Sequence, residues 1–143
     1  MSFQWLQMRI TEEKDRRQRE SAILERLPRM MDEVHSALVA CVESYIEAFG
    51  PEAIEMTYQN HKIRVTVRIE QDARWEKSAK VEVTADAKLP GIHIDRNGVP
   101  LDIEVGLLPG DKIFYKDVEE FLTMEELTRR IMDRSLFPKL IAE

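Results

Sequence analysis

Apolar and polar residues alternate strictly in several segments near the middle of the chain. The clearest is KIRVTVRI at residues 62–69, where every second residue is Ile or Val and the others are Lys, Arg or Thr. A period of two places these apolar side chains on one face of a β-strand. A sheet of such strands has an apolar face that a second layer of structure must cover. This requirement restricts the fold more than any other feature of the sequence.

Short turns join the alternating segments and set their register. A two-residue turn at Asn60-His61 would pair residues 54–58 with residues 63–67, so that each apolar residue faces another. The asparagine–glycine pair at 97–98 is the strongest short signal for a second hairpin of this kind.

Further alternation at residues 79–85, and a proline–glycine turn leading into residues 112–116, complete the set of strands. Because the connections are short, neighbouring strands must run in opposite directions. We therefore predict an antiparallel sheet of about six strands within residues 54–116.

The covering layer is predicted to be a core helix over residues 28–50. Apolar residues recur at helical spacing and fall on one broad side of it: Leu27, Met30, Met31, Val34, Leu38, Cys41, Val42, Tyr45, Ile46 and Phe49. The pair Gly50-Pro51 ends this run, and Pro28 either kinks one longer helix or begins a second one.

A capping box, Thr-Met-Glu-Glu at residues 123–126, predicts a short helix near the C-terminal end. Helix, strands and helix in that order define an α+β fold, with the core helix packed on one face of the sheet. We predict a single domain over residues 1–143, divided into a polar helical arm (1–27), the core helix (28–50), the sheet (54–116), and the C-terminal helix and tail (117–143).

The predicted arm lacks large apolar residues in its middle but begins with a cluster of them. The cluster consists of Phe3, Trp5, Leu6 and Ile10. Thr11 is placed to cap a helix that begins after the cluster, and residues 12–21 have nothing apolar to bury within their own domain. We favour docking of the cluster on a second copy of the chain, because aromatic anchors are typical of interfaces. The alternative is that residues 3–10 fold back on their own sheet.

Composition narrows the kinds of partner. The formal net charge is −6, so the phosphate backbone of a nucleic acid would repel the domain as a whole. The single cysteine, Cys41, excludes an internal disulfide and a multi-thiolate zinc site and fits a reducing cytoplasm. The first ten residues are not a secretory signal, and no stretch has the roughly 20 apolar residues of a membrane span. We predict a cytoplasmic protein that binds neither nucleic acid nor membrane and needs no cofactor.

The polar face of the hairpin at residues 92–103 gathers several titratable groups. They are His93, Asp95, Asp102 and Glu104. These groups could bind Mn²⁺ or Mg²⁺, or His93 could act as a base oriented by Asp102. The other interpretation is the polar outer face of an antiparallel sheet. Pro100, which has no N–H, indicates a sheet edge or a break in pairing, so we favour the outer face and predict no metal site and no catalytic residue.

The predicted inward face of the sheet offers little for catalysis, because Tyr58 is its only residue with a polar side-chain atom. The main hypothesis is therefore a non-enzymatic, self-associating interaction module, either a homodimer or a partner of another protein. The alternative is a protein or enzyme that binds a small apolar ligand in a pocket between helix and sheet near Tyr45 and Tyr58.

Overall fold

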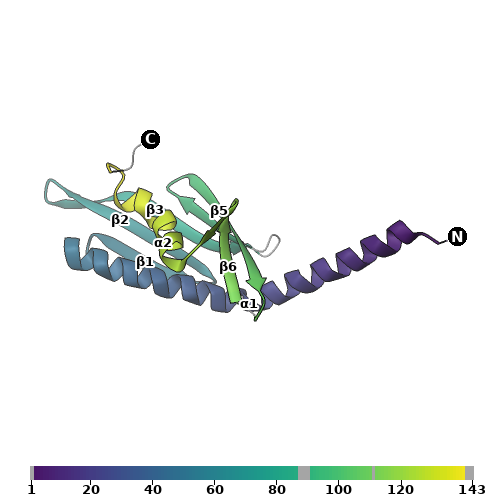
Figure 1. Cartoon of the computed structure of the whole chain (residues 1–143). Coiled ribbons are helices and arrows are strands. Elements are labelled where there is room, and N and C mark those ends of the chain that lie inside the picture. Colours follow the sequence, from purple (N-terminus) through teal and green to yellow (C-terminus); the bar gives the residue numbers. More distant parts are fainter. Residues whose placement is uncertain (1, 87–90, 111, 141–143) are drawn as a thin grey trace.

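The computed structural model describes residues 2–86, 91–110 and 112–140, and it has the predicted α+β fold (Figure 1). The two helices are α1 (Gln4–Phe49) and α2 (Met124–Leu136). The strands are β1 (Ile54–Gln59), β2 (Lys62–Gln71), β3 (Arg74–Asp86), β4 (Gly91–Arg96), β5 (Val99–Leu108), β6 (Lys112–Asp117) and β7 (Glu120–Leu122). They form one antiparallel sheet in which spatial order follows sequence order.

Both hairpin registers predicted from the sequence are confirmed. Residues 54–58 pair with residues 63–67, and residues 92–96 pair with residues 99–103, with the predicted facing partners. All four residues of the two turns have positive φ, which type I′ turns require.

The break in pairing indicated by Pro100 is also present. The ladder between β5 and β6 begins at Glu104, so within the described chain no strand lies beyond Pro100 on that side of β5. The missing N–H of the proline therefore leaves no gap in a ladder.

The sheet has seven strands rather than about six, and it continues past the predicted limit at residue 116. The additional strand, β7, has three residues, which is too short for alternation to be recognised in the sequence. β3 also begins earlier than its alternation suggests. A register shift leaves Ser78 as an extra residue on β3, and such a bulge breaks the period of two. Beyond the bulge, Ile69 is 42% exposed rather than buried.

A single apolar core joins the sheet to both helices. Its fully buried large residues come from α1, from the three strands β2, β4 and β5, and from α2: Met30, Met31, Val34, Leu38, Ile63, Val65, Ile92, Ile94, Ile103, Leu127, Ile131 and Met132. α2 begins at the predicted capping box, in which Thr123 and Glu126 cap each other reciprocally. It contacts α1 as well as the sheet, so the two helices cover the same face (Figure 1).

α1 is one helix that contains Pro28 rather than two helices that meet there. Pro28 cannot donate to the carbonyl of Leu24, and the two halves of α1 run at an angle to each other (Figure 1). The predicted helix start after Thr11 is wrong. Thr11 lies inside α1 and its hydroxyl donates to the carbonyl of Gln7 at 3.1 Å, because the helix already begins at Gln4.

We expect Leu38→Ala to lower the free energy of unfolding by about 2–5 kcal/mol, because Leu38 is fully buried between α1 and the sheet. The midpoint of chemical denaturation measures the change. Glu43→Ala, on the exposed side of the same helix, should alter stability by no more than about 0.5 kcal/mol. An unchanged midpoint for Leu38→Ala would contradict the packing described above.

Candidate interaction surface

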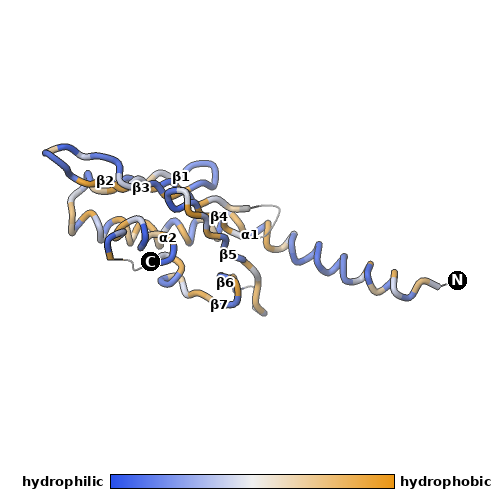
Figure 2. Tube along the Cα trace, turned by 90° about the horizontal axis from the view of Figure 1, so that it is seen from above, coloured by the Kyte–Doolittle hydropathy of each residue, from blue (hydrophilic) through white to orange (hydrophobic). Residues whose placement is uncertain are grey.

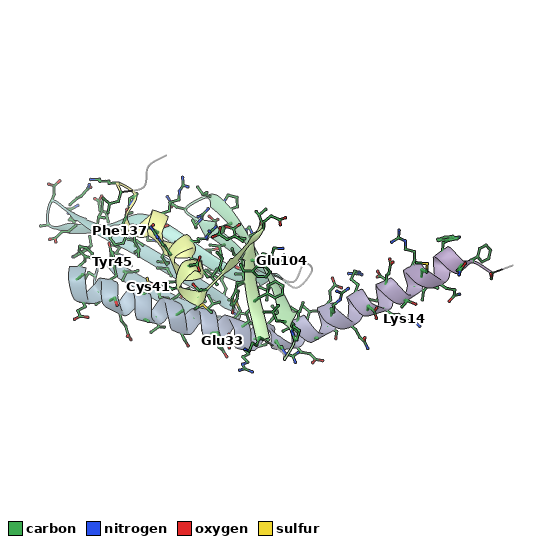
Figure 3. The ribbon with its side chains drawn as sticks, in the orientation of Figure 1. Lys14, Glu33, Cys41, Tyr45, Glu104 and Phe137 are labelled. Atoms are coloured by element: carbon green, nitrogen blue, oxygen red, sulfur yellow. The ribbon has the colours of Figure 1, made fainter. Side chains whose placement is uncertain are left out.

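The first half of α1 extends beyond the sheet as a helical arm (Figure 1). From residue 2 to residue 21 every side chain is exposed, except those of Glu13 and Glu20, which are half-buried. Lys14, in the middle of this stretch, lies far from the sheet and from α2 (Figure 3). We call residues 3–27 the arm and the rest of the described chain the body.

One side of the arm continues the buried side of the core helix. Residues spaced alternately three and four apart lie along one side of an α-helix. Starting at Phe3, this spacing passes through Leu6, Ile10, Glu13, Arg17, Glu20, Leu24 and Leu27, and we call these eight residues the seam. The same spacing then reaches Met31, Val34 and Leu38, which are buried against the sheet. The side of α1 that the sheet covers in the body is therefore uncovered along the arm.

The apolar part of the seam lies at its two ends. Leu6 and Ile10 are 37% and 38% exposed near the start of the arm, and Leu24 is 38% exposed where the arm meets the body. Phe3 belongs to the same side and is also exposed, whereas Trp5, at 66% exposed, falls outside the seam. Three of the four residues predicted for the interface thus share one side of the helix.

Charged residues occupy the middle of the seam and make ion pairs along the arm. The carboxylate of Glu13 accepts from Arg16 at 2.6 Å and from Arg17 at 3.0 Å, and Glu20 pairs with Arg16 at 2.8 Å. Figure 2 shows this hydrophilic stretch between more hydrophobic ends. Pairs three or four residues apart stabilise a helix that has no tertiary contacts of its own.

The charges on the arm also shift the titration of Glu13. Hydrogen bonds from Arg16 and then from Arg17 lower the pKa of Glu13 to about 2, from an ordinary value of 4.5. The carboxylate is therefore charged throughout the physiological range.

The two tyrosines predicted to line a ligand pocket lie in different surroundings. The Tyr58 hydroxyl donates to Asp32 at 2.8 Å, and its ring packs on His35. Tyr45 instead contacts Phe49 and lies 6.0 Å from the ring of Phe137, which follows α2 (Figure 3). Asp32 and Tyr45 are thirteen residues apart along α1, or roughly 20 Å at about 1.5 Å per residue, so the structure does not bring the tyrosines into one site.

The hairpin cluster is reduced to one pair. His93 Nδ1 lies 2.6 Å from an Asp102 oxygen, with the two side chains 49% and 79% exposed. Asp95 accepts from the backbone N–H of Gly98 in the turn. Within the described ranges, no three His, Cys, Asp or Glu side chains are grouped so that they could hold a metal ion.

Two features have no clear signal in the sequence. The spacing of the seam is present there, but Glu13, Arg17 and Glu20 interrupt its apolar residues, so it does not stand out as an apolar stripe. Tyr115 of β6 is buried, and its hydroxyl has no hydrogen-bond partner within the described chain. Burial, followed by the charge of Glu33, raises its pKa. No sequence pattern distinguished this tyrosine from an ordinary core residue.

Comparison with known proteins gives no relative from which a function could be transferred: no protein-family model, curated protein or solved structure matches the chain. Over the residues that the structure describes, neither helix combines the length and the apolar character needed to cross a membrane.

The stabilisation that Glu13 gives the arm should depend on pH. A lowered pKa means that the contribution is complete above about 4.5 and is lost as the pH falls towards 2. We therefore expect Glu13→Gln to reduce helical circular dichroism at pH 7 and to have no effect below pH 2. Glu25→Gln, at an exposed position outside the ion pairs described for the arm, is the control and should have little effect at either pH. Equal losses in the two variants at pH 7 would contradict the prediction.

Proposed function

We propose that the protein is a non-enzymatic self-association module in which the arms of two copies pack side by side in opposite directions. The observation that carries this proposal is the seam, which continues the buried side of α1 beyond the body. Any helix that packs on the seam must present apolar residues at both ends and complementary charges in the middle. A second copy of the same arm meets both conditions.

The charges on the seam favour one orientation. In a parallel pair in register, Glu13 would face Glu13 and Arg17 would face Arg17, so both central contacts would repel. In an antiparallel pair with its two-fold axis beside Asp15, Glu13 faces the partner's Arg17. The symmetry repeats this contact, so two opposite-charge contacts replace two like-charge contacts.

The same register brings the apolar ends together. Leu6 faces the partner's Leu24, and Phe3 faces the partner's Leu27. The weakest contact is that of Ile10 with the partner's Glu20, whose carboxylate is already paired with Arg16 in its own chain. Because Leu6, Ile10 and Leu24 are 37–38% exposed, their burial recovers only part of the roughly 1.5–3 kcal/mol for a whole side chain.

This limited gain sets the expected affinity. Association costs an estimated 4 kcal/mol or more in lost translational and rotational freedom. We therefore propose a weak, reversible dimer that forms at tens of micromolar. The overlap of residues 3–27 would span about 36 Å at 1.5 Å per residue, with one body at each end.

The remaining features agree with an interaction role. The buried side chains of the sheet are apolar apart from the Tyr115 hydroxyl, and Ser135 is the other buried residue with a side-chain hydroxyl in the described chain. We assign the module no catalytic residue and no cofactor. The net charge and the single cysteine support a place in the cytoplasm, away from nucleic acid.

Charge reversal tests the proposal directly. Size exclusion with light scattering at tens of micromolar should give a dimer for the wild type and monomers for Glu13→Arg alone and Arg17→Glu alone. An equimolar mixture of the two variants should form a heterodimer, because each contact then joins opposite charges. The double variant should dimerise as the wild type does.

Asp15→Arg is the matched control, because it changes the charge of the arm by the same amount on the side away from the seam. It should remain dimeric. A monomeric wild type at tens of micromolar would overturn the proposal. So would single reversals that stay dimeric, or a mixture that stays monomeric.

A further inference from the structure

A hollow of about 260 Å³ lies between the β4–β5 turn and the end of α2. Among the described residues, its lining contains two guanidinium groups and no carboxylate: Ser78, Ala79, Arg96, Asn97, Val99, Arg134, Ser135 and Pro138. In a chain with a net charge of −6, a concave surface with this composition is unusual. It lies on the body, so it is separate from the seam.

Arg96 is held in this hollow by neutral groups. Its Nη1 donates to the carbonyl of Arg130 at 3.2 Å, and its Nη2 lies 3.4 Å from the carbonyl of Pro100. Its Nε is buried and has no partner within the described chain. Neighbouring Arg130 differs, because its guanidinium pairs with the carboxylates of Asp117 and Glu120.

The electrostatics of Arg96 are therefore incompletely compensated. Burial, followed by the positive charge of Arg134, lowers the pKa of Arg96, and the negative charge of Asp117 opposes these effects only in part. A guanidinium has five N–H donors. Two are used on carbonyls and the Nε donor is buried, which leaves two donors on the terminal nitrogens.

A second hollow, of about 340 Å³, is lined by four arginines, Arg96, Arg129, Arg130 and Arg134, but it also contains carboxylates. Its lining includes the carboxylates of Glu126 and Asp133. Glu126 accepts from Thr123 in the helix cap, and Asp133 pairs with Arg129 at 3.4 Å. An anion there would meet two negative charges beside the guanidinium groups, whereas the described residues that line the first hollow include no carboxylate.

We propose that the hollow between the β4–β5 turn and the end of α2 binds a small oxyanion, a phosphate or carboxylate group, on Arg96 and Arg134. Guanidinium groups bind both kinds of oxyanion through paired, charge-assisted hydrogen bonds. The amide of Asn97 and the hydroxyls of Ser78 and Ser135 supply further donors from the lining.

The size of the hollow limits the ligand. Pockets for drug-sized ligands measure about 300–1,000 Å³, so 260 Å³ suits a small phosphorylated or carboxylated molecule. The site does not depend on self-association, and it adds ligand binding to the proposed interaction module.

Inorganic phosphate and acetate are the probes, titrated separately into the full chain at constant ionic strength with chloride as the balancing anion. The readout is the NMR signal of the Arg96 Nε–H group, whose burial should slow its exchange with water. We expect a saturable shift with at least one probe. Saturation with phosphate alone identifies a phosphorylated ligand, with acetate alone a carboxylated one, and with both a site that accepts either oxyanion.

Arg134→Gln should weaken the binding by about tenfold or more, because it removes one of the two guanidinium groups. Arg96→Lys keeps the positive charge but loses the planar guanidinium group, which can donate two parallel hydrogen bonds to one oxyanion. This variant should therefore weaken binding as well. Arg129→Gln, in the lining of the other hollow, is the matched control and should bind normally. If Arg96→Lys does not fold, Arg134→Gln still decides the question. Linear shifts equal to those with chloride, or saturation unchanged by Arg134→Gln, would overturn the proposal.

Discussion

Burial of the apolar face of the sheet beneath α1 is the interaction on which the rest of the structure depends. Val65 and Leu38, from the two layers, are both fully buried in the core. This packing fixes which side of α1 faces the sheet. The three-and-four spacing of the buried residues continues along α1 beyond the end of the sheet. The arm therefore presents the same side without a cover, and the seam is a consequence of how the core is built.

Much of the fold could be predicted from local patterns. The turn at Asn97-Gly98 set one hairpin register, and Pro100 marked the place where pairing stops, because each of these residues has a conformational requirement of its own. Features without such a local signal were missed. β7 is too short to show a period, and the bulge at Ser78 interrupts the period that would have revealed the start of β3.

The candidate sites were harder to predict than the fold, because they depend on which elements meet. Tyr45 and Tyr58 looked like one pocket in the sequence, yet they contact different parts of the body. Arg96 and Arg134 come from a strand and a helix whose ends are brought together only by packing. The exposed apolar cluster at the start of the arm could be predicted from the sequence: it contains Phe3, Leu6 and Ile10. The charges of Glu13 and Arg17 lie on the same side as this cluster only because α1 is one continuous helix, so their relation to it could not be predicted.

The orientation of the arms tests the central claim most directly. In a Cys41→Ser background, Leu6→Cys and Leu24→Cys should form an intermolecular disulfide when the two variants are mixed and oxidised. Neither variant alone should do so, because equivalent positions lie about 27 Å apart in the antiparallel pair, at 1.5 Å per residue. Efficient self-linking of Leu6→Cys alone, or no cross-link in the mixture, would contradict the account.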